Sequence, residues 1–315
     1  MNKCFATFHA KLEINSHIIG KDEDIILGIT KEEIGNIINN AVKESKLNNF
    51  KTLGLPEEPM WTLPIIGFAS GDDDYFDLYK KEIGEFYWTP SEAFSLKYKD
   101  EIVSRQELTV VSFAFAQTKE TKDVQSTSEI MPSLRWLVSR GEWEPFIYDI
   151  CNKVMGELEK KGIEAVAIDL LPQWSRMVSE KFGIASKWSH RHTAFIAGLG
   201  TFGLSDGLIT RQGKAMRFCS IIVKEKLDPD KRPYIKYNEW CKFYAEGTCG
   251  ECITRCPVEA ISKEGHDKEI CSLYLQLIKK EIGPDVVRNS NYISGCGLCQ
   301  TRIPCQDGVP VKIAD

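Results

Sequence analysis

The cysteines of this chain are concentrated near its C-terminal end, and their spacing constrains the fold more than any other feature of the sequence. Eight of the eleven cysteines lie between residues 241 and 305. They form a first run, an isolated cysteine and a second run: Cys241, Cys249, Cys252 and Cys256, then Cys271, then Cys296, Cys299 and Cys305. A four-iron cluster needs four thiolates that converge from different directions, and a short C-x2-C loop supplies two of them. The count of eight therefore predicts two 4Fe–4S clusters.

The pairing of the cysteines follows from the Cys256-Pro257 ending of the first run. In bacterial ferredoxins the cysteine before this proline ligates the other cluster of the two. The predicted ligand sets are therefore crossed: set 1 is Cys241, Cys249, Cys252 and Cys305, and set 2 is Cys256, Cys271, Cys296 and Cys299. Glu246 occupies the place of the first ferredoxin cysteine, so Cys241, five residues upstream, is the expected substitute. The alternatives at this position are a different fourth ligand or a three-iron cluster.

Two other uses of clustered cysteines fit the sequence less well. Disulfides require an oxidising compartment, and the first residues of the chain show no export signal. Structural zinc takes two C-x2-C pairs per metal, which explains neither the Cys-Pro ending nor the isolated Cys271. Iron–sulfur clusters account for both features.

Composition and charge limit the remaining possibilities. A chain of 315 residues with 43% hydrophobic and 27% charged residues can hold one large domain and a small appended one. The net charge of −5 gives no overall basic field for nucleic acid, and no apolar run approaches the roughly 20 residues that span a bilayer. We expect a cytoplasmic protein without membrane association, in a reducing, anaerobic cell where iron–sulfur clusters survive best.

The pattern of apolar residues predicts an α/β or α+β fold with an open sheet. Residues 23–47 have helical periodicity, with Thr30 and Glu33 as a candidate capping box. The other expected elements are a buried strand at 108–116, a polar loop at 117–130, a helix at 143–160, a strand at 165–169 and a hairpin at 207–223. The pattern suggests three regions: a helical, aromatic-rich region at 1–104 that caps the substrate side, an α/β core at 105–225 and the cysteine module at 226–315.

A glycine-rich segment precedes the expected hairpin. Gly198, Gly200 and Gly203 have the G-x-G-x-x-G spacing of a dinucleotide fingerprint, but the segment leads into a hairpin instead of opening a helix. Glycines let the backbone approach a flat or phosphorylated cofactor closely. The alternative is a tight turn that packs against its own chain.

With this glycine segment, the Leu208-Ile209-Thr210 strand and the double-cluster module, the chain resembles the epoxyqueuosine reductases and the related reductive dehalogenases over roughly residues 105–310. The resemblance implies a nitroreductase-like core that binds a corrinoid (cobalamin), and a bacterial ferredoxin-like module whose two clusters pass electrons singly to cobalt. It assigns to the corrinoid the backbone of Gly198, Leu199, Gly200, Thr201 and Gly203, together with Arg140 in a partly kept arginine–glycine motif.

Three polar residues before the glycine segment extend this site. His190, Arg191 and His192 form a histidine–arginine cluster, which can bind an anionic group such as the corrinoid phosphate or donate protons. The alternative is an exposed polar loop. By position, Asp169 corresponds to an acid of the family, and an apolar setting would raise its proton affinity as a general acid requires. Its alternative roles are a helix cap or an ion pair at the strand end. We therefore predict Asp169 and His190 as catalytic, and Arg191 and His192 as cofactor-binding.

The predicted function is an anaerobic, corrinoid-dependent reductase that removes halogen or oxygen from a small organic substrate. A ferredoxin or flavodoxin is the expected low-potential electron donor. A tRNA substrate is not expected, because the chain is acidic and lacks the helical repeats that follow the clusters in tRNA-acting members. The alternatives are an electron-transfer protein that reduces a partner's redox centre and a flavin-dependent reductase.

Overall fold

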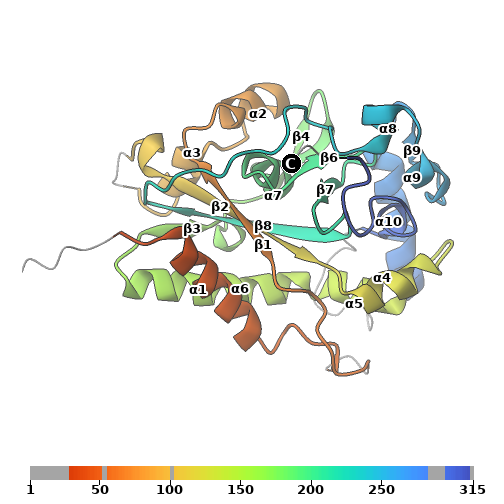
Figure 1. Cartoon of the computed structure of the whole chain (residues 1–315), viewed down its shortest axis with the longest axis horizontal. Coiled ribbons are helices and arrows are strands. Elements are labelled where there is room, and N and C mark those ends of the chain that lie inside the picture. The colour runs from red at the N-terminus through yellow and green to blue at the C-terminus, as the bar shows by residue number, and fades with distance from the viewer. Residues whose placement is uncertain (1–27, 52–54, 100–102, 283–294, 313–315) are drawn as a thin grey trace, which may run out of the picture.

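The fold is built on an open four-stranded antiparallel sheet. The computed structural model describes residues 28–51, 55–99, 103–282 and 295–312 of the chain. The strand order is β1-β2-β8-β3 (Figure 1). The bounds of these strands are Ile65–Ser70 for β1, Thr109–Ala116 for β2, Met216–Val223 for β8 and Ala165–Ala167 for β3. The central strand β2 is buried along its whole length, as a strand covered on both faces must be.

Helices cover both faces of the sheet (Figure 1). One face packs against α1 (Lys31–Glu44) and α6 (Trp143–Lys160), and the other against α2 (Tyr75–Ile83), α3 (Pro90–Ser95) and α7 (His190–Ile196). Because side chains alternate along a strand, β2 sends Val111, Phe113 and Phe115 to the first core, and Val110, Ala114 and Ala116 to the second. Two apolar cores thus hold the sheet in place.

The C-terminal part of the chain gathers at one end of the molecule (Figure 1). Its elements are α8 (Lys242–Glu246), α9 (Glu251–Thr254), β9 (Ile261–Ser262), β10 (Gly265–His266) and α10 (Lys268–Ile282). The remaining elements are α4 (Lys119–Ser126), α5 (Leu134–Gly141) and two small antiparallel pairs, β4–β5 (Arg176–Ser179 and Gly183–Ser186) and β6–β7 (Gly200–Phe202 and Leu208–Thr210). Leu137 of α5 packs against Tyr274 and Ile278 of α10, which joins the two parts.

Several expected elements are confirmed. The first helix begins at Lys31, and the capping box of its N-cap Thr30 with Glu33 is formed; the expected stretch 23–27 lies outside the described residues. The helix expected at 143–160 coincides with α6, and the buried strand expected at 108–116 is β2. The mixed α/β class is therefore confirmed, with a wholly antiparallel main sheet. The nitroreductase-like and ferredoxin-like descriptions and the three region boundaries stay predictions.

Two expectations are wrong. The polar stretch 117–130 contains α4, whose N-terminal Thr118 accepts a hydrogen bond from the Thr121 backbone. Its polar side chains are used in packing, since Gln125 Nε2 donates to the Cys296 carbonyl at 2.8 Å. The stretch 207–223 is not one hairpin, because β7 pairs with β6 whereas β8 pairs with β2 and β3. The turn between β7 and β8 is free to face the cysteine module instead.

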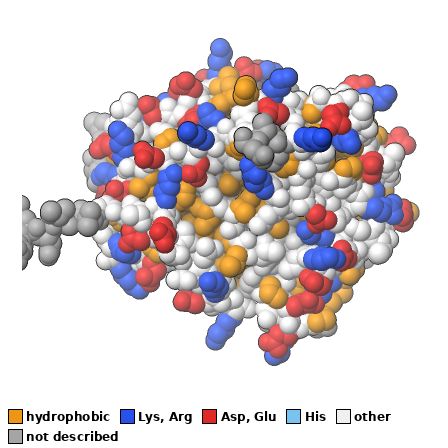
Figure 2. All heavy atoms as spheres, in the orientation of Figure 1, with side chains coloured by type: hydrophobic (Ala, Val, Ile, Leu, Met, Phe, Trp, Pro, Cys, Tyr) orange, Lys and Arg blue, Asp and Glu red, His pale blue; other side chains and the backbone are white. Residues whose placement is uncertain are grey.

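The molecular surface carries charges of both signs. Figure 2 shows lysine and arginine side chains interspersed with acidic ones over the visible face. None of the helices in the described ranges has the length and apolar character that a bilayer crossing requires.

Candidate functional site

The four thiols of set 1 line one cavity. Cys241 lies at the start of α8, Cys252 lies within α9, and Cys249 and Cys305 come from loops. Lys214, Phe243 and Ile303 complete part of the wall. Burial raises the pKa of Cys305 to about 11, and the charges of Cys241 and Cys249 act in the same direction, while Lys214 opposes them. The structure thus places the distant Cys305 beside three cysteines of the first run, in the cavity where set 1 was predicted.

The thiols of set 2 are also mutual neighbours. Burial raises the pKa of Cys271 to about 12, with added effects from the charges of Cys299 and Cys256. Burial likewise raises the pKa of Cys296, and the other three thiols of set 2 add to that rise. Buried thiols that resist ionisation become good ligands when a cationic metal core offsets the charge of their thiolates. This donor chemistry fits an iron–sulfur cluster at each set.

Contacts with the core hold the cysteine module in position. The Ala260 backbone N–H donates to Cys256 Sγ at 3.3 Å, a backbone-to-sulfur bond of the kind that tunes cluster sulfurs. Trp136 Nε1 donates to the Gly295 carbonyl at 3.1 Å. Gly297 has φ +72°, and a Cβ there would lie 1.9 Å from the Trp136 ring. The second cysteine run is therefore packed directly on α5.

A second cluster of polar side chains lies where β3 ends beside β8. Asp169, in the short turn after β3, has Oδ2 3.1 Å from His190 Nε2. The opposite ring nitrogen, His190 Nδ1, lies 2.8 Å from Ser220 Oγ. Trp188 Nε1 also donates to Ser220 Oγ, at 2.9 Å. The imidazole is thus fixed at both nitrogens, and the Asp169 and His190 side chains are only 19% and 16% exposed.

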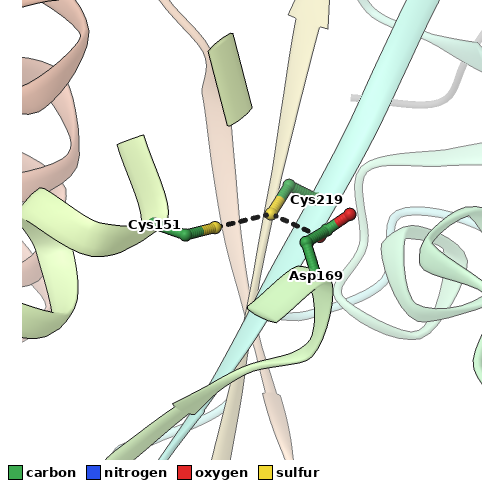
Figure 3. A group of neighbouring side chains, drawn as sticks. All are labelled: Cys151, Asp169 and Cys219. Carbon is green, nitrogen blue, oxygen red and sulfur yellow. Dashed lines mark hydrogen bonds between the residues drawn. The ribbon is translucent and has the colours of Figure 1, made fainter. Parts of the chain in front are cut away.

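Two core cysteines complete this group. Figure 3 shows the sulfur of Cys219, from β8, between Cys151 of α6 and the Asp169 carboxylate. The Cys219 thiol donates to Asp169 Oδ2 at 3.2 Å, and its sulfur lies 3.7 Å from that of Cys151. Burial alone would raise the pKa of Asp169, but the charge and hydrogen bond of His190 and the hydrogen bond of Cys219 lower it overall.

The direction of this shift corrects one expectation. The sequence analysis expected an apolar setting to raise the proton affinity of Asp169, and it missed the partners that reverse the effect. Asp169 is therefore a carboxylate at neutral pH, which accepts hydrogen bonds and has no proton of its own to donate. The contact of Asp169 with His190 corresponds to the alternative role considered for Asp169, an ion pair at the strand end.

The glycine segment is filled by atoms of its own chain. A Cβ at Gly200 would lie 2.2 Å from the Ile209 carbonyl oxygen, because β6 pairs closely with β7. A Cβ at Gly203 would lie 3.0 Å from Lys214 Nζ. Leu199 packs in the core, and Thr201 Oγ1 accepts from the Trp240 backbone at 2.8 Å. Gly198 has φ +80° directly after α7. These contacts match the alternative of a packed turn, and a role of the segment toward a corrinoid stays a prediction.

The other residues assigned to the corrinoid make contacts within the chain as well. Arg140 is buried over the Trp136 ring and donates to the Met216 carbonyl at 3.3 Å. His192 lies between two aromatic rings, and its Nδ1 is 2.7 Å from Ser189 Oγ. Arg191 is exposed and donates to the Asp206 carbonyl. Their role toward a cofactor stays a prediction.

Three residues that sequence reasoning did not assign to a site belong to these groups. Cys219 and Ser220 carry no signal in the sequence, because both lie in a strand whose pattern is simply apolar. Lys214 lies in a turn beside Gly213, where a lysine is ordinarily exposed, so its burial becomes apparent only in the structure.

Comparison with known proteins was made by sequence and by structure. No family model matches the chain. It is 23% identical over 250 residues to the epoxyqueuosine reductase of Lactococcus garvieae, covering 78% of this chain and 66% of that protein. It is 31% identical over 110 residues to the epoxyqueuosine reductase of Leadbetterella byssophila, covering 34% of each. The chain is a relative of the epoxyqueuosine reductases. It spans just under two thirds of the first relative and about one third of the second.

Solved structures of the same kinds of protein are also similar. A structure of epoxyqueuosine reductase with an epoxyqueuosine-modified stem loop of tyrosine tRNA has a TM-score of 0.42 and 18% identity, over 79% of this chain and 63% of that one. A catabolic reductive dehalogenase has a TM-score of 0.46 and 15% identity, over 78% of this chain and 30% of that one.

These relatives correct the expected partner. The expectation of a small-molecule substrate, with tRNA as an unlikely partner, is wrong. The relatives are epoxyqueuosine reductases, and a solved structure of an epoxyqueuosine reductase contains an epoxyqueuosine-modified tRNA stem loop as that protein's partner. The argument from net charge failed because a binding surface depends on local charge, which the total of −5 does not describe.

Proposed function

We propose that this protein is an iron–sulfur oxidoreductase that reduces an epoxyqueuosine-type nucleoside carried on tRNA. In this proposal the cysteines of set 1 and set 2 each hold one 4Fe–4S cluster. The observation that carries the proposal is the convergence of Cys241, Cys249 and Cys252 with the distant Cys305 on one cavity. The relatives, named epoxyqueuosine reductases, support the reaction class and the substrate.

The clusters would supply electrons one at a time, and the reaction also needs protons. Reduction of an epoxide to an alkene consumes two electrons and two protons and releases one water. Within the described residues, the Asp169–His190 pair is suited to move such a proton, because a carboxylate oxygen and an imidazole nitrogen lie 3.1 Å apart. Ser220 at 2.8 Å fixes the ring orientation, and each side chain of the pair keeps a small exposed fraction.

Cobalamin enters the proposal through the sequence resemblance alone. The glycine segment predicted to cradle it is occupied by Ile209 and Lys214 of the same chain. We therefore derive no step through a corrinoid. A cobalamin titration of the reconstituted protein, monitored by visible absorption, tests whether it binds.

The proposed reaction is tested with the cluster-loaded protein under anaerobic conditions. The substrate is a tyrosine tRNA stem loop that carries epoxyqueuosine, with a chemical reductant, added cobalamin and mass spectrometry of the nucleosides. We expect conversion to the deoxygenated nucleoside by the wild-type protein, and none by Asp169→Asn. Cys151→Ser is the matched control, because Cys151 contacts Cys219 but not His190. Iron-loaded protein that leaves the stem loop unchanged would refute the proposed substrate.

A further inference from the structure

A buried lysine lies between the two sets of cysteines. Lys214, in the turn between β7 and β8, is 3% exposed and lines the cavity of set 1. Its Nζ donates to Ser205 Oγ at 2.6 Å. Burial raises the pKa of the Cys299 thiol, which belongs to set 2, while the charge of Lys214 and a hydrogen bond from Ser205 oppose that rise. The Lys214 ammonium group therefore lies in the wall of the set 1 site, and the Ser205 hydroxyl lies between it and Cys299 of set 2.

The charges around Lys214 come from cysteines. The thiols that act most strongly on its ammonium group are those of Cys305 and Cys252, followed by Cys299 and Cys241. Across the described part of the chain, no carboxylate forms an ion pair with Lys214. A buried ammonium group is costly unless an anion compensates it. The cysteines of the two sets become the compensating anions for Lys214 when they ligate a metal as thiolates.

The glycine segment shapes the space for this side chain. A Cβ at Gly207 would lie 2.5 Å from Lys214 Cε, and a Cβ at Gly203 would lie 3.0 Å from Lys214 Nζ. Both glycines therefore leave room along the aliphatic stem and beside the ammonium group. At the turn itself, Gly213 packs on the backbone of Gln306, next to Cys305. The glycine segment thus helps to hold the Lys214 ammonium group among the cysteines.

We propose that Lys214 is a positioning residue that raises the reduction potentials of both clusters and links them through Ser205. This inference rests on the proposed ligation of the clusters by the eight cysteines. A cluster with its four thiolates is a net anion and gains one more negative charge on reduction. A fixed positive charge beside it stabilises the reduced form more than the oxidised form, especially where water is excluded. Removal of the charge must therefore move both potentials to more negative values.

The test is an EPR-monitored redox titration of the reconstituted protein. Lys214→Met keeps the length and the aliphatic stem but removes the charge. We expect at least a tenfold loss in the equilibrium constant for one-electron reduction of each cluster, which corresponds to about 59 mV. Lys242→Met is the matched control, because Lys242 lines the same cavity but is 37% exposed and pairs with Glu246 at 3.7 Å. Water screens that charge, so its removal should have a much smaller effect.

A second variant separates the two clusters. Ser205→Ala removes the link between Lys214 and Cys299 and leaves the charge beside set 1, so only one of the two potentials should fall. Ser205→Ala also tests the proposed influence of Lys214 on the potentials if Lys214→Met fails to retain iron. Potentials that stay at wild-type values in iron-loaded Lys214→Met, or in Ser205→Ala, would overturn the role of Lys214. Absence of iron and sulfide from the wild-type protein would refute the proposed clusters instead, and the iron assay distinguishes the two failures.

Discussion

A methyl group added at Gly213 should disrupt set 1 selectively. Gly213 has φ +93°, a region that costs an L-residue about 1–2 kcal/mol. A Cβ at this position would lie 1.9 Å from the Gln306 carbonyl oxygen and 2.5 Å from its carbonyl carbon. These are backbone atoms and cannot rotate away, so Gly213→Ala must shift the chain next to Cys305, at a further cost of about 1–3 kcal/mol.

The expected result is a loss of about 2–5 kcal/mol of stability together with the cluster that Cys305 helps to hold. Iron analysis after reconstitution should fall from about eight to about four atoms per chain, and the apparent thermal midpoint should fall by several degrees. Gly247→Ala is the matched control, because Gly247 has φ +68° but no atom within 4 Å of an added Cβ. It should incur only the backbone cost and keep all the iron. A Gly213→Ala protein with wild-type iron and midpoint would refute the packing described for this turn.

Three further predictions concern the polar group near β3 and the histidine cluster. Asp169→Asn should abolish turnover while iron content stays at the wild-type level, measured by product analysis and iron assay; turnover within a few-fold of wild type would exclude a catalytic role. Cys219→Ala removes a hydrogen bond that lowers the pKa of Asp169, so the acidic limb of the pH–rate profile should move to higher pH; an unmoved limb would show that the thiol has no influence. Burial, aided by the Arg191 charge, lowers the pKa of His192 from 6.5 to about 3. His192 therefore binds a proton more readily in the unfolded chain than in the folded one. Its contribution to the free energy of unfolding is complete above about pH 6.5 and is lost as the pH falls toward 3. His192→Phe should flatten the fall in thermal midpoint between pH 7 and pH 5, and an equally steep fall would contradict that origin.

The parts of the molecule that could be predicted from sequence are those fixed by neighbours along the chain. Thr30 and Glu33 form their capping box within one helical turn, and the composition of 108–116 is sufficient to predict a buried strand. The helix at 143–160 follows from its own apolar periodicity. The cysteine spacing was informative for a similar reason, since ligand loops have a fixed geometry.

The remaining features depend on contacts between distant residues. The pKa of Asp169 is set by His190 and Cys219, which come from other elements and cannot be placed beside it from spacing alone. The glycine segment has the letters of a cofactor motif, but its backbone packs against Ile209 and Lys214 once β6 pairs with β7. Helix α4 is polar because its side chains bond to the second cysteine run, so apolar periodicity does not reveal it.

The crossed ligation of two clusters is tested most directly by iron and sulfide analysis of single-cysteine variants, combined with EPR of the reduced proteins. Wild-type protein should bind about eight irons, whereas Cys305→Ala and Cys296→Ala should each bind about four and lose different EPR signals. Cys305→Ala and Cys241→Ala should lose the same signal, because both residues belong to set 1. Cys151→Ala, a change in the core away from both sets, should keep all the iron. Loss of the same signal from Cys305→Ala and Cys296→Ala, or full iron in either, would contradict the two-cluster account.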